Sequence, residues 1–131
     1  MQAYPKVVML GGDPDDFQVA EMLARLAAVT RVGKISEAIS QLERGDCDVL
    51  FCPWHSAEGT WRDVLEEVHK RQLEVPVVVF CHCGGEHEWT EALNAGAFDL
   101  LAPPYDSHQI RELLEHALES RYATAGSRLR S

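Results

Sequence analysis

The stretch that decides the fold reads Ala92-Leu-Asn-Ala-Gly-Ala-Phe-Asp-Leu-Leu-Ala-Pro-Pro-Tyr-Asp106. It opens with residues of helical period, and Gly96 stands where that helix should end, because glycine readily takes the left-handed conformation of a helix C-terminus. The apolar run Phe98–Ala102 follows at once and predicts a short strand. A loop with two prolines comes next. The stretch therefore predicts a helix, a buried strand and a loop in close succession.

Similar apolar runs recur along the chain and predict the other strands. They are Lys6–Leu10, a weaker run at Val29–Val32, Asp48–Cys52 and Val75–Cys81. The runs are continuous rather than alternating, which is typical of strands buried on both faces of a parallel sheet.

Apolar stripes at i, i+3 and i+4 spacing predict a helix after each strand. The stripes are Phe17, Ala20, Leu23, Ala24 and Ala27; Ile35, Ala38, Ile39 and Leu42; Trp61, Val64, Leu65 and Val68; Trp89, Ala92 and Leu93; and Ile110, Leu113, Leu114, Ala117 and Leu118. Asp13-Pro14 predicts a capped helix start, with Asp16 in the first turn, and Thr60 with Asp63 fits a capping box.

Strands and helices that alternate in this way predict a (βα)5 chain, an α/β three-layer sandwich of the flavodoxin-like class. Because crossovers between parallel strands are right-handed, the favoured sheet order is 2-1-3-4-5, with functional residues at the carboxyl ends of the strands. Residues 1–120 are predicted to form one domain. Helical period is lost from about Arg121, so residues 121–131 are predicted to be a flexible tail or the start of a linker.

Composition excludes several classes of function. The 131 residues carry 12 basic and 21 acidic side chains, a net charge of −9, which disfavours nucleic acid and anionic membranes as partners. No apolar run is long enough to span a bilayer and the N-terminus does not resemble a signal peptide, so a cytoplasmic location is expected. The four cysteines are expected to be reduced thiols.

The stretch Ala92–Asp106 resembles the receiver (CheY-like) domain of two-component response regulators. The family pattern there is A-x-x-A-G-A-x-D-Y-L-x-K-P-F-D. Val75-Pro-Val-Val-Val-Phe80 and Asp48-Val-Leu-Phe51 resemble two other strands of that family, and the resemblance runs from Lys6 to Leu118. It implies a role in phosphorelay signal transduction.

The resemblance also implies where the phosphorylation chemistry should lie, and this chain departs from the pattern at each position. The acidic pair that holds Mg²⁺ falls on Gly11 and Gly12, and the phosphoacceptor aspartate falls on Pro53. The Ser or Thr position falls on Cys81, and the lysine position falls on Pro103. Proline has no nucleophile that could attack a phosphoryl group, and glycine has no carboxylate that could bind Mg²⁺. Neither proline nor cysteine carries the fixed cation that would stabilise a bound phosphoryl group. We therefore expect a pseudo-receiver that is not an enzyme and needs no cofactor.

Asp13 could enter this pocket only if the loop register shifted by one residue. Asp13, Asp15 and Asp16 are more simply read as helix-start residues, where acidic side chains favour the helix dipole.

A domain without phosphorylation would signal by protein contact. The surface that the family uses implies contacts through Trp89, Leu100, Tyr105 and Ile110, with a histidine kinase, an effector domain or another regulator as partner, or with a second copy in a homodimer. Tyr105 is either an aromatic side chain fixed in one position or an ordinary packing residue. The resemblance further implies a cis peptide bond before Pro104.

Two alternatives stay open. Cys52, His55, Cys81, His82 and Cys83 should lie near the carboxyl ends of two strands and could form a metal or redox site, although Cys81-His-Cys83 lacks the usual ligand spacing. A flavodoxin-like binding protein or enzyme would use the glycines after the first strand to hold an anion, although the nearby aspartates would repel a phosphate.

The tryptophans carry a further expectation. Trp61 and Trp89 begin predicted helices and are expected to cover the sheet. Trp54 follows the third strand and would either plug the degenerate pocket or lie exposed at a contact surface.

Overall fold

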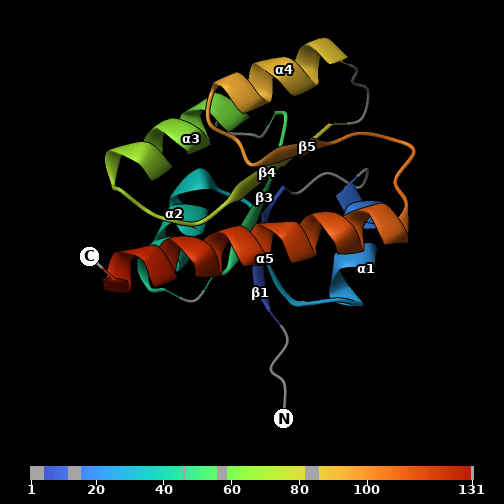
Figure 1. The fold of residues 1–131 in the computed structure, drawn as a ribbon. Helices are drawn as coiled ribbons and strands as arrows, with labels where there is room; N and C mark the ends of the chain where they lie inside the picture. The colour runs from blue at the N-terminus through green and yellow to red at the C-terminus, as the bar shows by residue number, and fades with distance from the viewer. Residues whose placement is uncertain (1–4, 12–15, 46, 56–58, 82–85, 131) are drawn as a thin grey trace.

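A computed structural model describes residues 5–11, 16–45, 47–55, 59–81 and 86–130. The strands are β1 (Lys6–Leu10), β2 (Ala28–Val32), β3 (Val49–Pro53), β4 (Val77–Phe80) and β5 (Asp99–Leu101). The helices are α1 (Phe17–Ala24), α2 (Ile35–Glu43), α3 (Trp61–Lys70), α4 (Glu86–Asn94) and α5 (Ser107–Arg130). The strands form one parallel sheet in the order β2-β1-β3-β4-β5 (Figure 1), which confirms the predicted fold class and topology.

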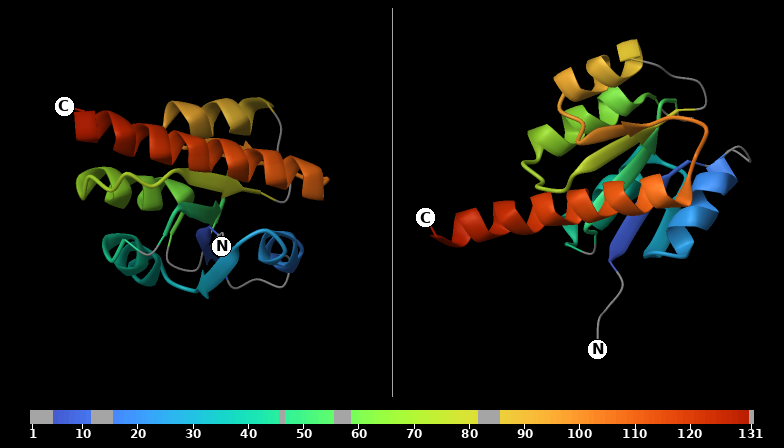
Figure 2. Two further views of the ribbon diagram at one scale, coloured as in Figure 1. Left: turned by 60° about the horizontal axis from the view of Figure 1, so that its bottom comes forward. Right: turned by 45° about the vertical axis from the view of Figure 1, so that its right-hand side comes forward.

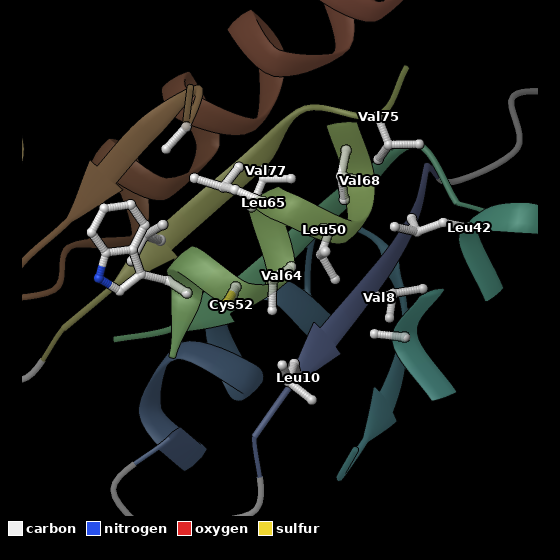
Figure 3. Packing of buried hydrophobic residues seen from close by; sticks show 14 of the residues in the cluster. Val8, Leu10, Leu42, Leu50, Cys52, Val64, Leu65, Val68, Val75 and Val77 are labelled. Atoms are coloured by element: carbon white, nitrogen blue, oxygen red, sulfur yellow. The ribbon is translucent and has the colours of Figure 1, made fainter. Parts of the chain in front are cut away.

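The sheet is covered on both faces, as continuous apolar strands predict. Successive strand residues point to opposite faces. In β1, Val7 and Met9 therefore pack in a cluster with α1 and α5, whereas Val8 and Leu10 pack in a second cluster with α2, α3 and α4. Figure 3 shows the second cluster, with Val64 and neighbouring residues of α3 lying over the strands.

The predicted buried stripes are confirmed for α2, α3 and α5 and are partly wrong for α1 and α4. Phe17 is 56% exposed, and Val19 instead begins the buried face of α1. Residues two apart on a helix do not share a face, so burial of Val19 turns Phe17 towards solvent. Trp89 is 48% exposed and does not cover the sheet, whereas Trp61 is buried as expected.

Helix ends follow local sequence where the structure describes them. Gly45 and Gly96 have positive φ angles of 78° and 109° directly after α2 and α4. The backbone N–H of Thr60 donates to Oδ2 of Asp63 at 2.9 Å in the predicted capping box. The predicted Asp13-Pro14 cap lies outside the described residues.

The last helix does not end near Ser120, as the loss of helical period predicted, because α5 continues to Arg130. That residues 121–131 form a flexible tail or the start of a linker stays a prediction. The segment after Ser120 contains no proline, and an established helix extends at little cost through such residues. Arg121 holds the helix against the connections that precede β3 and β4: its guanidinium lies 3.3 Å from Oδ1 of Asp48 and donates to the carbonyl of Glu74 at 3.2 Å. The C-terminal end of α5 extends past the strands (Figure 2).

None of the helices in the described part of the chain combines the length and apolar character that a membrane span requires.

Candidate functional site

The carboxyl ends of β1 and β3 meet where the resemblance locates the phosphorylation pocket. Gly11 is buried with a φ of 139°, and its N–H donates to the carbonyl of Val32 at 3.0 Å. A Cβ atom at Gly11 would lie 2.5 Å from Oδ2 of Asp16 and 3.7 Å from Cγ of Pro53. The space in front of Gly11 is therefore filled by a carboxylate and a proline ring. Gly12 and Asp13 lie outside the described residues.

Asp16 is the N-cap residue of α1, one position before the first turn in which it was expected, and its side chain has a placement that the sequence did not indicate. Its side chain is only 2% exposed and makes no cap hydrogen bond to α1. It instead lies against Gly11, inside the pocket. Glycine at position 11, which leaves room for a neighbouring side chain, is the one sequence signal that could have indicated this placement.

Arg31 on β2 brings a cation to Gly11, directly after β1. Its Nη2 donates to the carbonyl of Gly11 at 3.2 Å, and its guanidinium lies 5.1 Å from the centre of the Phe17 ring. The Gly11 carbonyl, a potential cation ligand, is thus engaged by a side chain. Sequence reasoning missed this contact because the two residues are brought together only by β1–β2 pairing.

At the other side of the pocket, Cys81 and Tyr105 interact through the backbone. The N–H of Cys81 donates to the carbonyl of Leu101 at 3.0 Å, and the Tyr105 hydroxyl donates to the carbonyl of Cys81. Tyr105 is half-buried against the α1 and α5 cluster, which supports the packing interpretation. Pro103 is exposed, and the predicted cis bond between Pro103 and Pro104 is confirmed.

The thiols near the pocket belong to the core. Cys52 is buried, its Sγ lies 3.4 Å from the Pro53 carbonyl, and burial raises the pKa of its thiol. Cys81 is also buried, whereas His55 is exposed. His82 and Cys83 lie outside the described residues. Among the side chains that the structure describes, His, Cys, Asp and Glu nowhere form a group of three placed to hold a metal ion.

An open groove lies beside this pocket, between α4, β5 and α5. Its apolar part is formed by Trp89, Leu100, Ala102, Pro103 and Pro104, with Asp106 and Gln109 at a polar end, and its volume is ≈ 570 Å³. Nε1 of Trp89 donates to Oδ1 of Asp99 at 3.0 Å, which holds the half-exposed indole in place.

Two residues expected on the contact surface need correction. Leu100 is only 7% exposed and contributes to the bottom of the groove. Ile110 is fully buried with the α1 and α5 cluster, so it is not on the surface at all. The reason is that the inward stripe of α5 passes through Ile110, whereas its neighbour Gln109 lines the groove.

Aromatic and charged side chains join the β3–α3 loop to α4. The ring centres of Trp54 and Trp61 lie 5.0 Å apart, and Trp54 is half-buried, neither a fully exposed contact residue nor a plug at Gly11. The guanidinium of Arg62 lies 4.6 Å from the centre of the Trp61 ring and forms an ion pair with Glu91 on α4. This bridge was missed because no local pattern relates the two helices.

The chain is similar in sequence to known response regulators. It is 30% identical to the response regulator protein PilR of Pseudomonas aeruginosa over 118 residues. This aligned region covers 88% of this chain and 26% of PilR. The chain is 29% identical over 82 residues to the transcriptional regulatory protein ZraR of Salmonella typhimurium, which covers 63% of this chain and 19% of ZraR. The chain thus spans about a quarter or less of these relatives. No family model matches it.

The structure is similar to those of receiver domains. The response regulator receiver domain protein (CheY-like) from Methanospirillum hungatei superimposes with a TM-score of 0.75 at 13% identity, over 93% of this chain and 99% of that one. With the sequence similarity to PilR, this likeness in fold identifies the chain as a response regulator receiver (CheY-like) domain of the two-component type.

Proposed function

We propose that this receiver domain signals by protein contact and does not accept a phosphoryl group. One observation carries the proposal: Pro53 is the last residue of β3 and is buried at the position where the resemblance locates the phosphoacceptor aspartate. Transfer of a phosphoryl group to the domain needs a nucleophile, and a proline ring has none.

The surroundings of Pro53 support the same conclusion for the metal ion. Mg²⁺ prefers an octahedral set of oxygen ligands that usually includes carboxylates. Among the described residues, Asp16 is the only carboxylate known to lie against Gly11. The Gly11 carbonyl, a possible metal ligand, already accepts a hydrogen bond from Arg31. Pro103 replaces the lysine cation that would stabilise a bound phosphoryl group. The domain is therefore proposed to be neither an enzyme nor a cofactor-binding protein.

The contact itself is proposed to occur at the groove between α4, β5 and α5. Trp89 is the one large aromatic residue among the described residues that line this groove, and it is half-exposed and hydrogen-bonded to Asp99. Aromatic side chains of this kind are enriched in protein interfaces. A histidine kinase, an effector domain or another regulator in the cytoplasm would be the partner, in line with the regulatory names of PilR and ZraR.

Incubation with acetyl phosphate, and separately with beryllofluoride, both with Mg²⁺, tests the loss of phosphorylation. We expect no mass increase by intact-mass spectrometry and no saturable change of the amide signals of Gly11, Cys52 and Trp54. An active receiver domain with an intact aspartate serves as positive control. A stable phosphoryl adduct on this chain would contradict the proposal.

The variant Pro53→Asp sharpens this test. It restores a nucleophile but neither the second Mg²⁺ carboxylate nor the lysine, so we expect it to remain without a stable adduct as well. Phosphorylation of Pro53→Asp at the rate of the positive control would show that only the nucleophile is missing and that the rest of the pocket works.

A further inference from the structure

We infer that the groove between α4, β5 and α5 binds a cationic apolar segment of a different protein, in which a bulky apolar side chain is flanked by lysine or arginine. The inference rests on the proposed function, and it adds the chemistry of the partner and excludes a second copy of this chain from that role.

The shape of the groove accounts for the apolar part of this segment. Its lining combines the buried Leu100 and the half-buried Ala102 with three more exposed residues, Pro103, Pro104 and Trp89. The groove has a volume of ≈ 570 Å³ and is open to solvent, so an apolar side chain can enter it. Because Trp89 is hydrogen-bonded to Asp99, binding would cost little loss of side-chain freedom.

The charges around the groove account for the cationic part. Asp106 is the only charged residue among the described residues that line it, and Asp99 lies beside it under Trp89. Glu112 is three residues after Gln109 and so continues the same side of α5, where its Oε1 lies 3.0 Å from Nε2 of His108. Arg111 is two residues after Gln109 and faces elsewhere. The groove therefore presents carboxylates without an adjacent lysine or arginine, which favours a positively charged partner.

The same charges disfavour a homodimer through this face. A two-fold interface brings the same patch of both copies together. Asp99 and Asp106 of one copy would then approach Asp99 and Asp106 of the other, and like charges in contact disfavour association. The groove lining contains no basic side chain that could pair with them, as far as the structure describes it. A heterologous partner avoids this repulsion.

Titration with three capped peptides tests the inference by NMR. The probes are acetyl-Arg-Leu-Leu-Arg-amide, acetyl-Ser-Leu-Leu-Ser-amide and acetyl-Glu-Leu-Leu-Glu-amide, followed by the indole N–H signal of Trp89 and the amides of Ala102 and Gln109. The arginine peptide is expected to bind saturably and at least about threefold more tightly than the serine peptide, as a surface ion pair allows. The glutamate peptide is expected to bind more weakly than both.

Two matched variants separate the groove from general acidity. Asp106→Asn should weaken binding of the arginine peptide about threefold and leave the serine peptide unchanged. Glu119→Gln removes an exposed carboxylate elsewhere on α5 and should change neither. Equal affinities of the three peptides, or equal effects of the two variants, would overturn the inference.

A further measurement tests the exclusion of a second copy. Amide signals of the groove should not move as the concentration of the free protein rises, and concentration-dependent dimerisation through these residues would overturn that exclusion. Failure of the proposed function has a different signature: no peptide of any charge shifts the groove signals, while a phosphoryl adduct forms at the pocket.

Discussion

The pocket at the carboxyl ends of β1, β3 and β4 and the groove beside β5 are neighbours with opposite character. In the pocket, Gly11, Pro53 and Cys81 are buried and the Tyr105 hydroxyl is bound to a backbone carbonyl. In the groove, Trp89 is 48% exposed above an apolar surface. The difference teaches that the described residues of the family's chemical site are packed like a core, while an adjacent apolar face is accessible to solvent.

The side chains themselves explain the difference. Gly11, Pro53 and Cys81 are small and uncharged, so they can be buried without the cost of removing a charge from water, and Asp16 is the one carboxylate that the described residues bury beside them. The groove contains the rigid Pro103-Pro104 turn and a tryptophan tied to Asp99. These groups cannot easily collapse into the core. We therefore expect the buried residues of the pocket and the exposed residues of the groove to differ in their reactivity towards alkylating reagents and in the loss of stability that substitutions cause.

The largest expected effect concerns the thiols. Burial raises the pKa of Cys47, at the opposite end of β3, to about 12, and burial also raises the pKa of Cys52 beside the pocket. Since only thiolates react, Cys47 and Cys52 should be alkylated by iodoacetamide at pH 8 on the order of a thousandfold more slowly in the native protein than in urea. Peptide mapping of a Cys83→Ser variant measures this. Rapid labelling of Cys52 would show that the pocket is open.

The raised pKa of Cys47 also predicts the pH dependence of stability. A thiol with a raised pKa in the folded state favours folding while it is protonated. This contribution is complete below the ordinary pKa of 9.0 and is lost as the pH rises from 9 towards about 12. Urea unfolding between pH 8 and 11 should show a smaller loss of stability in Cys47→Ala than in the wild type. Identical pH profiles would argue against burial of this thiol.

The next effect tests the packing in front of Gly11. Gly11→Ala should lower the free energy of unfolding by about 3 kcal/mol, because its Cβ would collide with Asp16 and its φ is unfavourable for alanine. Gly33 is a matched control: a Cβ atom there meets nothing within 4 Å, so Gly33→Ala should change stability by less than about 0.5 kcal/mol. Similar urea midpoints for the two variants would contradict a packed pocket.

The smallest effects compare one hydrogen bond from each region. Tyr105→Phe removes the donor to the Cys81 carbonyl and should cost about 1 kcal/mol, since it leaves a partly buried acceptor without its partner. Trp89→Phe removes the donor to Asp99 at an exposed site, where water can replace it, and should cost about 0.5 kcal/mol or less. The reverse order in chemical denaturation would mean that the groove, rather than the pocket, is the better-packed region.

The sequence by itself determined the order of strands and helices. Continuous apolar runs and apolar stripes of period 3.6 reflect which residues of each segment are buried. The runs predicted the five strands with ends no more than two residues from those observed. Local chemistry likewise predicted the capping box at Thr60 and the helix ends at Gly45 and Gly96. It could not predict the length of α5, because loss of apolar period does not by itself stop a helix.

Only the tertiary structure decided how the site is filled. Arg31 contacts Gly11 because β2 pairs with β1, and Asp16 contacts Gly11 because α1 begins beside the end of β1. No residue spacing in the sequence predicts these two contacts. Ile110 belongs to the apolar stripe that helical period predicted for α5. Only the packing of α5 on the sheet shows that this stripe faces away from the groove. Local pattern specifies which side chains leave water, whereas the paired strands and packed helices specify which of them meet.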